Sequence, residues 1–184
     1  MAGAAPAPPP APGLPRRALN ALYDGAAALA ALFMVLLLVM VTLSIVSRQL
    51  RFNVPGIDAY AGYMMAASGF LALAHTLKRG EHIRVTLLIG ALKGKARRVA
   101  ELWALFAGSL LALLFAGYSV RLAWQSRVFH DISTANDATP LWIPQLTMAV
   151  GTCILAVALI DELVLEWRGR RIVAGGADEL SRSE

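Results

Sequence analysis

Four long stretches without a single charged residue constrain the fold of this chain more than any other feature. Each covers roughly 19 to 23 residues, and about 20 helical residues cross the hydrocarbon core of a bilayer. The stretches are residues 25–47, 59–77, 102–120 and 141–160. They take up nearly half of the 184 residues, so no sizeable soluble domain remains. We therefore predict an all-α integral membrane protein whose four transmembrane helices pack as a bundle.

The composition agrees with this fold class. Charged residues make up only 16% of the chain, against about 25% in a typical soluble domain. The net charge is +5, but no basic patch outside the predicted spans has interleaved aromatic residues, so we expect no nucleic-acid partner. The single cysteine, Cys153, excludes an intramolecular disulfide. We expect it to be a small packing residue of the fourth span.

The distribution of lysine and arginine predicts the topology, because cytoplasmic loops of membrane proteins carry the excess of these residues. Of the 17 cations, only four fall on the side of the first and third loops: Arg48, Arg51, Arg121 and Arg127. The other 13 fall before the first span, between the second and third spans, or after the fourth. We therefore predict that both termini and the central connector are cytoplasmic.

The chain divides into three segments by composition. Residues 1–15 (MAGAAPAPPPAPGLP) form a Pro/Ala-rich tract that cannot build a core, and we expect a disordered lead. Residues 16–170 form the four-helix membrane domain, and residues 171–184 a polar cytoplasmic tail. A cleaved signal peptide is the alternative for residues 16–47, although their apolar run is longer than usual and lacks a clear cleavage site.

Details within the spans predict how the helices begin, end and approach one another. The third span belongs to a longer helix over residues 96–129, with Trp124 and Arg127 as an interfacial anchor. Pro144 is expected in the first turn of the fourth helix, where a missing N–H is tolerated. Small residues in the second span are expected to permit close helix approach. They are Gly62, Ala66 and Gly69.

No motif for catalysis or cofactor binding survives inspection. The run GALKGK at residues 90–95 has three residues between its glycines and no Ser or Thr after the lysine, so it is not a phosphate-binding loop. Of the histidines, only His75 lies within a predicted span, and neither His82 nor His130 opposes it for metal or haem ligation. No serine in the spans has a histidine at a spacing that would activate it. We predict no enzyme activity, no metal and no cofactor.

Ionisable residues gather at the ends of the spans and leave their centres bare. Asp58 opens the second span and is expected to pair with Arg48 or Arg51 across the first hairpin. Asp161 and Glu162 lie late in the fourth span, where Arg168 is the expected partner. A proton or ion relay usually places charges at the bilayer centre. The chain alone is therefore not expected to form a transport pathway.

The connector between the second and third spans contains a short apolar segment at residues 83–92, flanked by cations on both sides. A segment of this kind can lie in the membrane interface with its lysines and arginines facing the headgroups. We predict a short interfacial helix here, with an ordinary cationic loop as the alternative.

Three motifs stand at the ends of the predicted spans. Asp58 precedes the second span, the basic turn RGEHIRV at residues 79–85 follows it, and the run TPLWIP at residues 139–144 leads into the fourth. Over residues 16–170, this layout resembles the small membrane subunit of tripartite ATP-independent periplasmic (TRAP) transporters, the DctQ-like family. Its members have four membrane helices with both ends in the cytoplasm. One departure is Thr86, where family members often carry an acidic residue, so no carboxylate role transfers to this position.

The resemblance implies an accessory role in transport. In such systems the large membrane subunit binds substrate and sodium and moves as an elevator, while the small subunit anchors its scaffold. An extracytoplasmic solute-binding protein delivers the substrate, commonly an organic acid such as a dicarboxylate or a sialic acid. We therefore expect a non-catalytic subunit of a bacterial inner membrane, with these two proteins and the lipid bilayer as partners. The residues expected at the contacts are Arg79, His82 and Arg84 on the cytoplasmic surface and Arg48, Arg51 and Asp58 on the outer side.

Two other classes of function remain as alternatives. A stand-alone four-span membrane enzyme or redox protein would need a cofactor or a convergent polar cluster. A self-assembling channel would need a polar stripe along one span, and the second span comes nearest to this with Tyr60, Tyr63, Ser68 and His75.

Overall fold

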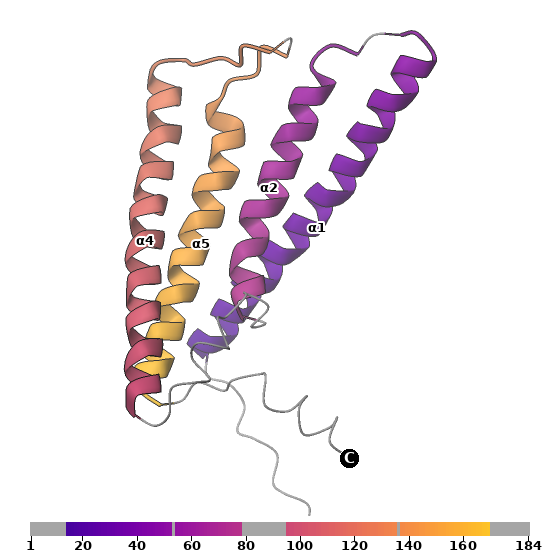
Figure 1. Ribbon diagram of the computed structural model, residues 1–184. Coiled ribbons are helices and arrows are strands. Elements are labelled where there is room, and N and C mark those ends of the chain that lie inside the picture. The colour runs from indigo at the N-terminus through magenta and orange to yellow at the C-terminus, as the bar shows by residue number, and fades with distance from the viewer. Residues whose placement is uncertain (1–13, 53, 79–94, 136, 170–184) are drawn as a thin grey trace, which may run out of the picture.

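The computed structural model describes residues 14–52, 54–78, 95–135 and 137–169, and these residues form four helices (Figure 1). The helices are α1 (Leu14–Gln49), α2 (Ile57–Lys78), α4 (Lys95–Val128) and α5 (Trp142–Trp167). All four are long and apolar enough to cross a membrane. The described residues contain no strand beyond one isolated bridge between Ile132 and Pro140. The prediction of an all-helical chain with four helices able to span a membrane is thereby confirmed, and the long third helix begins and ends within one residue of the prediction.

The four helices form an open row, whereas the sequence analysis predicted a bundle. Figure 1 shows them side by side in the order α4, α5, α2, α1. The extensive backbone contacts are those between neighbours in this row, and α1 and α5 share only a small contact. Among the described residues, the backbone of α4 packs only against that of α5. Because the described backbone of α4 does not contact that of α1, the four helices do not close into a bundle. This arrangement leaves large apolar faces uncovered, above all on α1.

The helices run between two ends of the molecule, which we call the basal end and the loop end. At the basal end α1 and α4 begin and α2 and α5 end; at the loop end the described residues 50–52, 54–56, 129–135 and 137–141 connect the helices. At about 1.5 Å per residue, the 36 residues of α1 and the 34 of α4 are longer than the roughly 30 Å hydrocarbon core requires. Both helices therefore reach beyond the hydrocarbon core.

Small side chains fill the contacts between neighbouring helices. Ala112 and Ala116 of α4 are buried against Ala156 of α5, and Ala74 of α2 is buried with Tyr23 of α1 and Ala158 of α5. Lipid tails are as apolar as leucine, so membrane helices associate through close packing, which alanine and glycine permit. This explains why the larger apolar side chains face outwards in this chain.

Gly151, in the middle of α5, lies directly against the backbone of α2. A Cβ atom at this position would lie 2.5 Å from the carbonyl oxygen of Phe70 on α2. The ring of Phe70 also reaches the ring of Phe115 on α4, with centroids 6.1 Å apart. The absence of a side chain at Gly151 therefore sets the distance between α2 and α5. The prediction of close approach at Gly62, Ala66 and Gly69 was wrong, because these residues lie on the exposed side of α2.

The loop-end connections stop the helices sharply. Arg51, with a φ of 55°, lies two residues beyond the end of α1 in the left-handed region, and Gly56, with a φ of +79°, precedes α2. In the second connection, the Ser133 N–H donates to the Thr139 carbonyl oxygen at 2.8 Å. Pro144 lies in the first turn of α5, as the sequence predicts.

Three sequence expectations fall outside the described residues. They concern the interfacial helix at residues 83–92, the tail at residues 171–184 and all but the last two residues of the Pro/Ala-rich lead.

Candidate functional site

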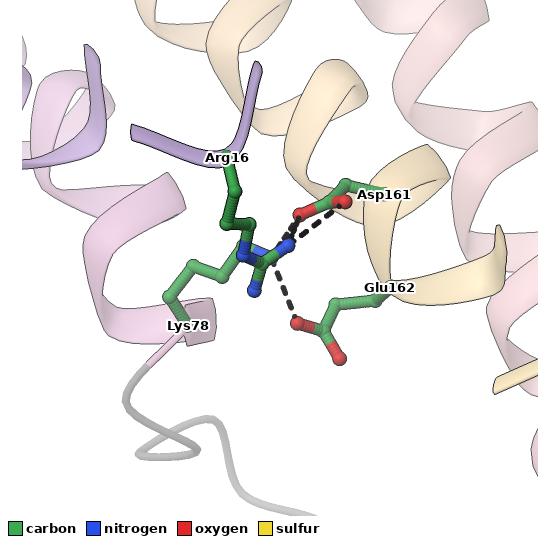
Figure 2. A network of polar contacts seen from close by, with 4 residues as sticks. All are labelled: Arg16, Lys78, Asp161 and Glu162. Carbon is green, nitrogen blue, oxygen red and sulfur yellow. Dashed lines mark hydrogen bonds and ion pairs between the residues drawn. The ribbon is translucent and has the colours of Figure 1, made fainter. Parts of the chain in front are cut away.

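The basal end holds an ion network that joins α1, α2 and α5 (Figure 2). Arg16 donates to both oxygens of Asp161, at 3.1 Å to Oδ1 and 2.8 Å to Oδ2. Lys78 also pairs with Asp161, and its Nζ lies 3.0 Å from Oε1 of Glu162. Figure 2 shows the two cationic side chains reaching from separate helices to the adjacent carboxylates of α5. Two cations thus neutralise two carboxylates.

This network is largely withdrawn from solvent. The side chains of Lys78, Asp161 and Glu162 are only 14%, 15% and 11% exposed, and Arg16 is 36% exposed. Removing one partner of a buried ion pair leaves an uncompensated charge in a medium of low dielectric constant, which costs far more than breaking a surface pair. Lys78 also lies over the ring of Tyr23, 5.2 Å from its centroid, and its charge suits the C-terminal turn of α2. The network therefore fixes three helices against one another.

The expected partner of Asp161 was wrong. Asp161 pairs with Arg16 and Lys78 rather than with Arg168, because the cations come from helix ends 145 and 83 residues away in sequence. The partners could have been predicted from the depth of these residues in the membrane. Arg16, Lys78 and Asp161 all lie at predicted span ends on the same side, where opposite charges meet once the spans are assembled.

The loop end contains a polar pocket of about 280 Å³ between the end of α1 and the start of α2. The structure brings Arg48, Arg51 and Asp58 together in it, as the sequence analysis expected of residues on one side of the membrane. The remaining lining residues are Ser44, Ser47 and Phe52. Three of the six predicted contact residues therefore share one site.

The electrostatics of this loop-end pocket differ from the expected ion pair. Asp58 accepts a hydrogen bond from Ser44 Oγ at 3.0 Å, and no ion pair joins it to Arg48 or Arg51 within the described residues. The predicted ion pair of Asp58 with Arg48 or Arg51 was thus wrong. The Ser44 hydroxyl of α1 lies closer to the Asp58 carboxylate than either guanidinium group does. Two guanidinium groups consequently line the pocket without a carboxylate partner from the described part of the chain. Such a pocket suits an anionic group.

A second polar contact at the loop end joins the two connections, and the sequence analysis missed it. Tyr63 of α2 donates to Oδ2 of Asp137 at 3.0 Å, and Thr139 donates to the Tyr60 hydroxyl at 3.1 Å. A Cβ atom on Gly56 would lie 2.6 Å from Cβ of Asp137, so the glycine lets the connections meet. We call this group the loop clasp. The contact of the second connection with α2 depends on the order of the helices, which the sequence does not show.

The hydrogen bonds of the loop clasp set the charge state of its carboxylate. Burial alone would raise the pKa of Asp137. The hydroxyl groups of Ser133, Thr139 and Tyr63 and a backbone N–H outweigh this effect and hold the pKa below its ordinary value. The carboxylate is therefore ionised at neutral pH and accepts the hydrogen bond from the Tyr63 hydroxyl.

The other predicted residues have simpler outcomes. Arg79, His82 and Arg84 lie outside the described residues. Cys153, expected as a packing residue, is exposed on α5, so that expectation was wrong. His75 Nδ1 lies 3.7 Å from Asp24 Oδ1, which is longer than a hydrogen bond. Across residues 14–52, 54–78, 95–135 and 137–169, no three His, Cys, Asp or Glu side chains lie together as metal ligands.

Comparisons with known proteins add one match. A family model described as the DctQ component of tripartite ATP-independent periplasmic transporters matches residues 37–169. A comparison with curated proteins gave no match. The matched range contains α2, α4, α5 and the last part of α1, together with the loop-end pocket, the loop clasp and all of the ion network except Arg16.

Proposed function

The chain belongs to the DctQ family of tripartite ATP-independent periplasmic transporter components, and from this premise we propose that it anchors the scaffold of the large transport subunit. The family is a transporter component and not an enzyme family. The chain is accordingly a multi-pass membrane protein with four candidate spans. We place it in a bacterial inner membrane, where the transporter would carry an organic acid. The basal end would face the cytoplasm, as the charge distribution predicts.

The observation that carries the anchoring role is the open row of helices. A protein that encloses a pathway needs helices around a central axis, whereas this chain exposes both faces of a single layer. Contiguous apolar surface of this extent must be covered by lipid or by another membrane protein. The row is also fixed at its basal end by the ion network, so it offers a stable surface against which a separate domain can move.

Within the row, we assign the exposed side of α1 to the large subunit. The membrane-crossing part of α1 is the least buried of the four, and its backbone lies close to α2 along its length but only marginally close to α5. Bulky apolar residues follow one another along this side, among them Leu32, Val35 and Leu38. This exposed side of α1 can be covered only by lipid or by a partner outside the chain.

Two proposals concern the predicted contact residues. At the loop end, the unneutralised Arg48 and Arg51 would receive acidic side chains of the solute-binding protein when it docks. On the cytoplasmic side, Arg79, His82 and Arg84 would contact headgroups or the large subunit; this second assignment rests on the sequence alone.

Co-purification and reconstitution test the proposed function. After mild detergent extraction, we expect the chain to emerge with a large polytopic protein, which the neighbouring reading frame should encode. Uptake of an organic acid into liposomes should require both membrane proteins and the binding protein. A chain that purifies alone and transports alone would refute the accessory role.

The α1 surface can be tested in the same preparation. Leu32→Trp with Leu38→Trp should reduce the amount of large subunit recovered, because the added rings separate the two surfaces. Leu110→Trp with Leu111→Trp makes the same change on the exposed side of α4 and serves as the control. Equal loss of the large subunit in both double variants would contradict the assignment to α1.

A further inference from the structure

A groove runs along α4 and α5 from the loop end towards the middle of the row. Its volume is about 420 Å³, and its lining residues include Ala123 and Trp124 of α4 with Leu146, Val150 and Cys153 of α5. Leu22 of α1 contributes to the same groove. Among the lining residues that the structure describes, Arg127 alone is charged. The groove is therefore apolar along its length, with one cation.

The length of the groove matches one leaflet of a bilayer. On α5 the lining extends from Trp142 to Ile154, which is about 18 Å at 1.5 Å per residue. Half of the roughly 30 Å hydrocarbon core is about 15 Å. A hydrocarbon chain that enters at the loop end would thus stay within the groove to about the bilayer centre.

Arg127 is placed where a lipid phosphate would lie. It occupies the last turn of α4, and its guanidinium carbon lies 5.4 Å from the centroid of the Trp142 ring at the start of α5. No carboxylate of the described residues pairs with it. Trp124, one turn earlier, is largely exposed, as is typical of tryptophan at a membrane interface. A cation held on an aromatic ring above an apolar groove has the polarity pattern of a phospholipid.

We propose that this groove binds one phospholipid from the leaflet at the loop end, with an acyl chain along α4 and α5 and the phosphate at Arg127. The single cation at the loop end of an apolar lining about one leaflet long favours a phospholipid over an apolar transmembrane helix. This site goes beyond the anchoring role and does not depend on it.

Native mass spectrometry of the full-length chain, alone and with any membrane protein that co-purifies, tests the proposal. After exchange into lipid-free detergent, titration with phosphatidylglycerol should give one tightly bound lipid in both preparations. Arg127→Gln should weaken this binding about tenfold, as expected for the loss of a charge-assisted contact. Arg121→Gln removes the same charge from α4 outside the groove and should leave binding unchanged.

A second pair of variants separates the groove from the charge. Cys153→Trp would fill the groove at an exposed position and should abolish the single adduct while Arg127 remains. Val157→Trp adds the same volume one turn further along α5, also at an exposed position, and should not. Helical content by circular dichroism checks that each variant is folded.

Three results would overturn the proposal. The first is equal weakening in Arg127→Gln and Arg121→Gln, which would show only non-specific attraction of anionic lipid. The second is unchanged binding in Cys153→Trp. The third is loss of the lipid whenever a partner subunit or a second copy is bound, which would show that the groove is a protein interface.

Discussion

The basal end and the loop end differ in whether their charged side chains are paired within the chain. At the basal end, Arg16 and Lys78 are matched by Asp161 and Glu162 in a partly buried network. At the loop end, the two arginines of the pocket have no carboxylate partner from the described residues, and the loop clasp depends on hydroxyl groups. Charges neutralised inside the chain hold its fold, whereas charges left unmatched are available to another molecule. We therefore expect substitutions at the basal end to affect stability and those in the loop-end pocket to affect partner binding.

The largest expected effect is at the basal end. Asp161→Asn deprives Arg16 of its carboxylate and leaves Lys78 with Glu162 alone, so it should lower the free energy of unfolding by about 3 kcal/mol. Thermal unfolding in detergent would measure the change. Asp24→Asn is the control, since Asp24 is exposed and lies 3.7 Å from His75. If both variants lose the same stability, the basal network is not the element that fixes the helices.

The second largest effect on stability is expected in the middle of the row, between the basal end and the loop end. Gly151→Ala would place a methyl group against the Phe70 backbone and should destabilise the protein by about 1–3 kcal/mol. Gly69→Ala meets no atom within 4 Å and should leave stability equal or slightly higher, because alanine favours the helix. Equal behaviour of the two variants in thermal unfolding would show that Gly151 does not set the contact of α2 with α5.

A smaller effect is expected for the loop clasp. Tyr63→Phe removes the hydroxyl that donates to Asp137 and should cost about 1 kcal/mol, the usual net value of one hydrogen bond. Tyr118→Phe makes the same change on the exposed side of α4 and should have no measurable effect on the unfolding temperature. A loss in Tyr63→Phe as large as that in Asp161→Asn would remove the contrast between the two ends.

The loop clasp should also respond to acid. The pKa of Asp137 is lower in the folded protein than its ordinary value of about 3.9. Its contribution to stability is therefore complete above about pH 4 and is lost as the pH falls through the lowered pKa. Unfolding of the native chain and of Asp137→Asn, compared between about pH 3 and pH 6, isolates this contribution. The stability difference between the two proteins should shrink towards the acid end, and a constant difference would contradict the assignment.

The smallest effect on stability is expected in the loop-end pocket. Arg48→Gln with Arg51→Gln should change the free energy of unfolding by less than about 0.5 kcal/mol, because neither arginine is paired within the described chain. The same double variant should reduce binding-protein-dependent uptake in liposomes. Arg121→Gln controls for loss of positive charge elsewhere. If the double variant is stable and uptake is unchanged, Arg48 and Arg51 do not dock the solute-binding protein.

The four helices could be predicted from the sequence because length and absence of charge alone decide whether a segment can cross a membrane. The lateral order of the helices could not. Every span is apolar on all sides, so no stripe of leucines marks the side that packs. The decisive residue, Gly151, resembles the equally small Gly62 and Gly69, and only the structure shows which of them meets another backbone.

The sites were predictable to different degrees for the same reason. Arg48, Arg51 and Asp58 are close in sequence, so a short hairpin brings them into one pocket regardless of helix order. The partners of Asp161 and Asp137 come from distant segments, and they depend on α2 lying beside α5. The spacing of residues in the sequence predicts contacts within one hairpin. It does not predict contacts between the two halves of the chain.

The single-file arrangement has a consequence for how the protein is assembled during synthesis. Its neighbours α1 and α2 are consecutive in the chain, as are α4 and α5, so each pair can insert as a self-contained hairpin while the ribosome is still translating. The α2–α5 contact at Gly151 is the main seam between these hairpins and must form last, after both are in the bilayer. A substitution there would leave two correctly inserted hairpins that fail to join, exposed to membrane quality-control proteases.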